Sequence, residues 1–163
     1  MAVIDRISIG TGHAAAWLTL LMVLVTTVIV VLRYAFDTGF IWLQESVTWM
    51  HAVVFMLGAA YTLQREEHVR VDVFYRDLTA RRRGWVNLLG TLFFIFPLCG
   101  FFLLSSYEYV AASWSIREVS RDAGGLPYPF VPLLKSVLLL MPVAVALQGV
   151  SLMMRSLLDI RTR

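Results

Sequence analysis

The sequence predicts an all-α integral membrane protein in which four transmembrane helices form a single membrane domain, residues 1–163, with both termini cytoplasmic. Two observations of composition lead to this: 59% of the residues are hydrophobic and only 15% are charged, and the mean hydropathy is +0.74. The third is length, because a membrane-spanning helix needs about 20 mostly apolar residues. Four such helices and their connections use nearly the whole chain and leave little for a soluble domain.

The first span is expected over residues 14–32, which carry no charged side chain. This stretch is too long for a signal peptide, and no small-residue cleavage pattern follows it. The second span is expected over residues 42–63 and contains polar side chains, which must face protein or the membrane interface rather than lipid. At 100° per residue these side chains share one side of the helix and predict a packing stripe, formed by Gln44, Thr48, His51, Gly58 and Thr62.

The third and fourth spans are expected over residues 85–109 and 129–158, each with an internal proline, Pro97 and Pro142. Proline lacks a backbone N–H and crowds the preceding turn, so each proline predicts a kink. A small and polar face recurs in two spans, in the first as Ala15, Thr19 and Thr26 and in the fourth as Ala144, Gln148 and Ser151. We expect these faces to meet one another or a partner protein.

Basic residues in the connections predict the orientation, because cytoplasmic loops carry an excess of Lys and Arg. The loop expected over residues 64–84 holds six arginines and the C-terminal tail holds three. The other two connections hold Arg33 alone and Arg117 with Arg121. The termini and the central loop are therefore expected in the cytoplasm. Since topology explains the clustered arginines, no nucleic-acid partner is expected.

The remaining polar residues offer little chemistry. Glu45, Glu108 and Lys135 project to the outer third of the membrane, where snorkelling, or pairing of Lys135 with either glutamate, satisfies them. His68 and Asp72 would share one face of a helix, but two ligands are too few for a metal site. No nucleophile with its base, phosphate-binding glycine loop or zinc motif occurs. We therefore expect neither an enzyme nor a cofactor.

Two other classes stay open. A haem- or quinone-associated membrane anchor subunit of an oxidoreductase is an alternative, because haem iron can be held between buried imidazoles. In the expected topology His13 lies near the inner surface, whereas His51 lies about 13 Å below the outer end of its helix at 1.5 Å per residue, which argues against a shared iron. A small homodimeric exporter would need a carboxylate near the middle of a span, and the sequence has none there.

Three short segments occur in a fixed order along the chain. The first span ends in Arg33-Tyr34-Ala35-Phe36, the second opens with Trp42-Leu43-Gln44-Glu45, and His68-Val69-Arg70-Val71-Asp72 follows it in the basic loop. This order resembles the small membrane subunit of TRAP transporters, the tripartite ATP-independent periplasmic systems of bacteria and archaea, over essentially the whole chain. One departure is that Glu45 stands between Gln44 and Ser46, where the family often has two adjacent acidic residues.

The resemblance implies a multi-pass protein of the bacterial inner membrane and a division of labour. A periplasmic binding protein captures an organic acid, and a large membrane subunit moves it by an elevator motion coupled to a sodium gradient. The small subunit then enlarges the immobile scaffold, or stator, of the large one. Its site residues are expected to be interfacial rather than catalytic, and the candidates are Arg33, Trp42, Gln44, Glu45, Thr48, His51, Gly58, His68, Arg70 and Asp72.

Overall fold

The computed structural model describes residues 2–65 and 78–161, and every regular element within them is helical. In chain order the elements are α1 (Ala2–Ala35), α2 (Ile41–Gln64), α4 (Ala80–Gly90), the π-helical turn η1 (Thr91–Ile95), α5 (Phe96–Ser115) and α6 (Phe130–Arg161). α4, η1 and α5 follow one another without a break. Four helical segments of the described residues are long and apolar enough to cross a membrane, which confirms the all-α prediction with four membrane-length helices.

The helices are longer than a membrane requires. α1 has 34 residues, or about 51 Å at 1.5 Å per residue, against a hydrocarbon core of about 30 Å. It begins at Ala2, well before the expected start of the span at residue 14, because a polar sequence does not by itself end a helix. Asp5 in the first turn even favours the helix through its dipole. The helix ends therefore extend past the apolar stretch and carry charged side chains that can reach one another.

The third membrane-length segment leaves α-helical geometry just before Pro97. Proline has no N–H and its ring crowds the carbonyl four residues earlier. In η1 the helix widens, and the Phe96 N–H donates to the carbonyl of Thr91, five residues back. Such a π-helical turn is one of the known ways in which a helix absorbs a local disruption. The helix thus passes Pro97 without a break, and α6 likewise continues through Pro142.

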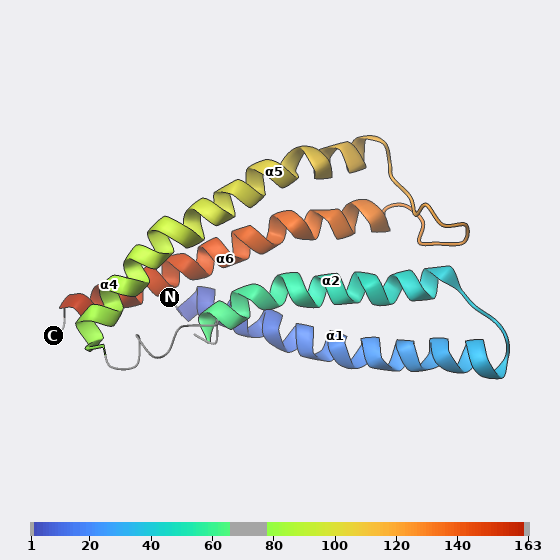
Figure 1. Ribbon diagram of the computed structural model, residues 1–163, viewed down its shortest axis with the longest axis horizontal. Helices are drawn as coiled ribbons and strands as arrows, with labels where there is room; N and C mark the ends of the chain where they lie inside the picture. The colour runs from blue at the N-terminus through green and yellow to red at the C-terminus, as the bar shows by residue number, and fades with distance from the viewer. Residues whose placement is uncertain (1, 66–77, 162–163) are drawn as a thin grey trace.

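The four segments stand side by side in the order α1, α2, α6, α5 rather than closing into a square bundle (Figure 1). α1 packs on α2, α2 on α6, and α6 on both α4 and α5. Because a row leaves both of its broad faces open, little of the membrane-spanning surface is buried within the chain. In α1, none of the most apolar 18-residue window is buried.

Glycines permit the close crossings near one end of the row. A Cβ at Gly84 would come within 2.9 Å of the Ser156 carbonyl oxygen and of the Ile160 side chain, and a Cβ at Gly12 would collide with the Tyr61 ring. Membrane helices associate by close packing of this kind, because lipid provides no hydrophobic drive for their association. Gly84 therefore brings α4 against α6, and Gly12 brings α1 against α2.

The two ends of the row differ. The start of α1 and the end of α6 lie at the same end of the row (Figure 1), which we call the terminal end. The opposite end, which we call the loop end, carries the connections 36–40 and 116–129. α1 stops there because the backbone turns into the left-handed region at Asp37, with φ of 51°, a conformation that aspartate tolerates better than most residues.

Candidate functional site

At the loop end, the segment 116–129 is fastened to the start of α2 by Glu45. The Glu45 carboxylate accepts hydrogen bonds from the Ser120 hydroxyl and, at 2.6 Å, from the backbone N–H of Leu126. The backbone N–H of Trp42 donates to the backbone carbonyl of Gly124 at 3.1 Å. A Cβ at Gly125 would collide with Ser120 and come within 2.8 Å of Glu45 Oε1. Glu45 therefore acts within this chain, as the anchor of the segment.

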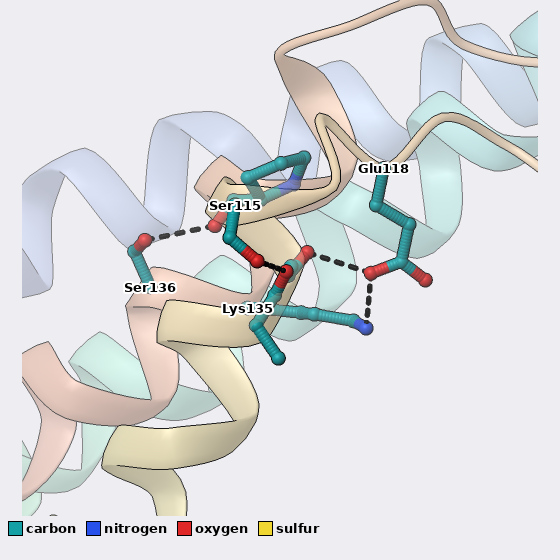
Figure 2. A network of polar contacts seen from close by, with 7 residues as sticks. Ser115, Glu118, Lys135 and Ser136 are labelled. Atoms are coloured by element: carbon teal, nitrogen blue, oxygen red, sulfur yellow. Dashed lines mark hydrogen bonds and ion pairs between the residues drawn. The ribbon is translucent and has the colours of Figure 1, made fainter.

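A second anchor of the same segment is the ion pair between Lys135 and Glu118, drawn in Figure 2. Lys135 Nζ lies 2.5 Å from Glu118 Oε2, and the Ser113 hydroxyl donates to the same oxygen at 2.7 Å. The ammonium also lies 4.0 Å from the centre of the Tyr109 ring, a cation–π contact. The hydrogen bonds from Lys135 and Ser113 hold the pKa of the Glu118 carboxyl below its usual value.

Lys135 therefore pairs with neither Glu45 nor Glu108, a pairing that the sequence left open as an alternative to snorkelling. Glu45 is occupied by the 116–129 segment. Glu108 is exposed on α5 and makes no ion pair or hydrogen bond with another described residue. The physical reason lies in the segment 116–129, which connects α5 to α6. This segment places Glu118 next to the Lys135 ammonium, so the lysine pairs with Glu118 rather than with a glutamate of the spans.

A polar cluster joins α1 to α6 toward the terminal end. Asp5 accepts hydrogen bonds from Gln148 at 3.2 Å and Ser151 at 3.0 Å, and pairs with Arg155 at 2.6 Å. The Ser8 hydroxyl donates to Gln148 at 3.0 Å. Gln148 and Ser151 are only 1% and 0% exposed. The small and polar face of the fourth span thus meets α1, but at Asp5 and Ser8 in its first turns rather than at the expected face of Ala15, Thr19 and Thr26, whose two threonines bond to carbonyls of their own helix.

Sequence reasoning missed six of the side chains that form these contacts: Asp5, Ser8, Ser113, Glu118, Ser120 and Arg155. A signal existed for Arg155, because it follows Ser151 by four residues and Gln148 by seven, and so shares their side of the helix. Asp5 and Glu118 had no such signal. Their partners lie on other elements, and local spacing carries no information about contacts across the fold.

The predicted stripe of the second span lies on an open face of the row. Gln44, Thr48 and His51 are exposed, and Gly58 is half-buried. α2 packs instead through other residues, which are Met50, Ala60 and Leu63. α1 and α6 pack against α2 from its two sides. The stripe of Gln44, Thr48 and His51 lies on neither of these contacting sides and faces away from the row.

Two grooves border this stripe. The larger, of about 490 Å³, runs between α1 and α2 and is lined by Met22, Val23, Thr26, Thr27, Val47, Thr48 and His51. The smaller, of about 210 Å³, is lined by Glu45, Thr48 and Trp49 of α2 together with Leu126, Phe130, Val131 and Leu134. Thr48 belongs to both. The open face is therefore a ridge of α2 side chains between two hollows.

The other predicted site residues are peripheral or undescribed. Arg33 is exposed at the end of α1, and Trp42 is exposed at the start of α2, with its ring centre 6.2 Å from that of Phe40. His68, Arg70 and Asp72 lie outside the described residues.

The register of α1 against α2 also bears on the haem alternative. Gly12, next to His13, packs on Tyr61, and His51 precedes Tyr61 by ten residues, or about 15 Å along the helix. One iron takes its two axial ligands from opposite sides at bonding distance. His13 and His51 are too far apart along the helices to serve as that pair. Among the described residues no group of three or more His, Cys, Asp or Glu side chains gathers as a metal site would require.

The fold and these sites define a multi-pass helical membrane protein, anchored by polar contacts toward both ends and open on its broad faces. Residues 22–161 match the DctQ component of tripartite ATP-independent periplasmic transporters, and the chain belongs to this family. The resemblance seen in the sequence is thereby confirmed.

A relative from Vibrio cholerae, the C4-dicarboxylate TRAP transporter small permease protein DctQ, is 34% identical over 69 residues. The aligned region covers 42% of this chain and 30% of the relative, so this chain spans less than a third of that protein's length. No solved structure matches the chain at comparable significance. The family is one of transport components rather than enzymes.

Proposed function

We propose that this chain is the small scaffold subunit, or stator, of a TRAP-type secondary transporter in the inner membrane of a bacterium. A large membrane subunit and a periplasmic binding protein complete the transporter, and together they take up an organic acid with sodium. In this proposal residues 1–163 form one membrane domain that carries no substrate itself.

The observation that carries the proposal is the open row of helices in a member of this family. A chain whose helices leave their broad faces uncovered has surface available for another membrane protein. The row is nevertheless fastened toward both ends, by the Asp5 cluster and by the two anchors of the 116–129 segment. Fixed helices with an open face suit a part that stands still while another part moves.

The charged side chains support a scaffold rather than a carrier. In carriers, substrate sites near the membrane midplane are built from interrupted helices and polar groups. Here Glu45, Glu118, Lys135 and the Asp5–Arg155 pair all lie toward the helix ends and are engaged with one another or with backbone. The π-helical turn η1 consists of Thr91 and four apolar residues, so it offers no charged group to a substrate.

The orientation that we propose places the terminal end in the cytoplasm and the segment 116–129 in the periplasm, as the positive-inside rule requires. Arg33, Trp42, Gln44, Thr48, His51 and Gly58 then lie from the periplasmic surface inward, where the large subunit or the binding protein can contact them. His68, Arg70 and Asp72 belong to the cytoplasmic loop, for which we propose a role in holding the assembled complex. The name of the Vibrio cholerae relative makes C4-dicarboxylates the first organic acids to test.

Co-purification tests the proposal directly. The tagged chain would be extracted from its native membrane in mild detergent, and the bound proteins identified by mass spectrometry. We expect a large polytopic membrane subunit to be recovered, and sodium-dependent uptake of an organic acid to require both chains. Recovery of the chain alone, or with a redox enzyme that shows haem absorbance, would count against the transporter and favour the membrane-anchor alternative.

Replacement of residues in the basic loop supplies a second readout. Arg70→Ala or Asp72→Ala should lower recovery of the complex, or uptake, without changing which organic acid is preferred. An altered substrate preference would contradict the scaffold role, because a stator does not touch the substrate.

A further inference from the structure

The groove between α1 and α2 lies at hydrocarbon depth. Arg33 and Glu45 are the charged residues nearest to it on the two helices, and charged side chains mark the membrane surface. Thr27 precedes Arg33 by six residues and His51 follows Glu45 by six, so both lie about 9 Å further in at 1.5 Å per residue. The groove is therefore an opening toward lipid below the level of the headgroups.

The hydroxyl groups in the groove are satisfied within their own helices. Thr26 donates to the Met22 carbonyl at 2.8 Å, and Thr27 donates to the Val23 carbonyl at 2.9 Å. Back-bonding of this kind is how threonine is accommodated in membrane helices. These hydroxyls need no external partner.

His51 differs from the threonines. Its side chain is exposed in the groove and makes no hydrogen bond with another described residue. A neutral imidazole has one donor and one acceptor, and a polar group without a hydrogen-bond partner in hydrocarbon is strongly unfavourable. Acyl chains offer neither donor nor acceptor, so lipid cannot fill this requirement at the depth of His51.

The remaining walls of the groove, Met22, Val23 and Val47, are apolar. The hollow, about 490 Å³ in volume, thus combines aliphatic walls with one unfulfilled hydrogen-bonding group. Helix–helix contacts in membranes are built from this combination, close aliphatic packing with single interhelical hydrogen bonds.

We propose that the α1–α2 groove receives one transmembrane helix of the large membrane subunit, and that this helix presents a hydrogen-bonding side chain to His51. The inference rests on the proposed function and narrows it to one face of the row. The exposed face of α5 is the contrasting surface. Phe101 and Leu104 are among its most exposed side chains, and both are apolar and satisfied by lipid alone.

Site-specific photo-crosslinking distinguishes the two faces. A benzophenone amino acid would replace Val23 or Thr48 in the groove, and Leu104 on α5 as the matched exposed control. Each variant would be irradiated in native membranes that contain the whole transporter. We expect adducts with the large subunit from the two groove positions and none from Leu104.

Other results would overturn the inference in distinguishable ways. An adduct with the large subunit from Leu104 but not from the groove would refute the assignment of the face while leaving the proposed function intact. If the benzophenone at the groove positions labels only phospholipid, in a chain that still co-purifies with the large subunit, the assignment of the face is likewise refuted and the proposed function is intact. Absence of any co-purifying large subunit would remove the proposed function together with the inference.

The hydrogen bond itself is tested by His51→Leu and His51→Gln. Interhelical hydrogen bonds in membranes correspond to about 3-fold in affinity on average and about 18-fold at most, so His51→Leu should weaken recovery of the large subunit within that range. His51→Gln keeps a donor and an acceptor and should retain more of it. Equal recovery with both variants and the wild type would exclude the bond. Unchanged thermal unfolding of each isolated chain would show that the variants fold.

Discussion

Glu45 and Glu118 hold the segment 116–129 from two sides at the loop end. Glu45 accepts bonds from Ser120 and Leu126, whereas Glu118 meets Lys135 of α6 and Ser113 of α5. A carboxylate is an acceptor only, so each glutamate can gather donors from elements that are distant in sequence. The two side chains thereby fix a connection that has no regular secondary structure of its own.

The Glu118 anchor predicts a dependence of stability on pH. Folding holds the pKa of Glu118 below its ordinary value of 4.5, so the folded state favours the ionised form. This stabilisation is complete above pH 4.5 and is lost as the pH falls through the lowered pKa. Thermal unfolding of the detergent-solubilised protein, measured from pH 7 to pH 3, should show the wild type losing its advantage over Glu118→Gln at the acid end. A constant difference over that range would argue against the anchor.

Gly125 predicts a steric effect at the other anchor. In Gly125→Ala the added methyl group meets Ser120 and the Glu45 carboxylate, so the segment must shift and weaken both hydrogen bonds. We expect a loss of about 1–3 kcal/mol in the free energy of unfolding, as for overpacked sites. Gly39→Ala is the matched loop control, since a Cβ there meets no atom within 4 Å. Equal denaturation curves for the two variants would exclude the steric role.

At the scale of elements, α1 and α6 are joined by a polar cluster in which Asp5 is the common acceptor. Gln148, Ser151 and Arg155 all direct donors to its carboxylate. α1 otherwise packs mainly on α2, so this cluster ties the helix at the edge of the row to a second neighbour. The extension of α1 beyond its apolar stretch is what allows Asp5 to reach α6.

Removal of the Asp5 carboxylate should weaken the attachment of α1 to α6 and lower the stability of the fold. In Asp5→Ala the buried side chains of Gln148 and Ser151 lose an acceptor, and each unsatisfied buried group costs about 1–3 kcal/mol. Arg6→Ala is the control, because Arg6 is the adjacent charged residue and is exposed. Unfolding by heat or denaturant should be markedly easier for Asp5→Ala than for Arg6→Ala. Comparable stability of the two variants would show that the cluster contributes little.

At the scale of the whole molecule, the termini lie at one end of the row and the segment 116–129 at the other (Figure 1). A chain with four crossings and its termini together has two possible orientations in a membrane. The arginines close to the terminal end, among them Arg81 and Arg82, favour the cytoplasmic placement of that end. The aromatic side chains near both ends suit the two membrane interfaces equally and do not distinguish the orientations.

Thiol labelling in intact cells tests the orientation. With the native Cys99 replaced by serine, Val119→Cys should react with a membrane-impermeant maleimide added from outside, because Val119 is exposed at the loop end. Asp159→Cys, exposed near the terminal end, should react only after the cells are permeabilised. The reverse pattern would invert the proposed topology and place the 116–129 segment in the cytoplasm.

Much of this molecule could be predicted from hydropathy and motif order, and some could not. The four membrane-length helices and the family were both predicted from the sequence. Gln148 and Ser151 were predicted to form a packing face, but that face meets the first turns of α1 rather than the small face expected further along this helix. The partner of Lys135, Glu118, was not among the candidates that the sequence offered, and the role of Asp5 was missed. In each of those two cases the contact joins side chains on different elements, and neither sequence separation nor helical periodicity indicates which ends of the chain come together.

Hydropathy and the order of motifs were enough to identify four membrane helices of the TRAP small-subunit family. Hydropathy is summed over about 20 consecutive residues and needs no knowledge of the fold. The tertiary structure alone decided that the helices stand in an open row, that Glu118 rather than Glu45 pairs with Lys135, and that the stripe through His51 faces outward. Those properties depend on which helices are neighbours, and in a membrane that choice rests on close packing and a few polar contacts between distant residues.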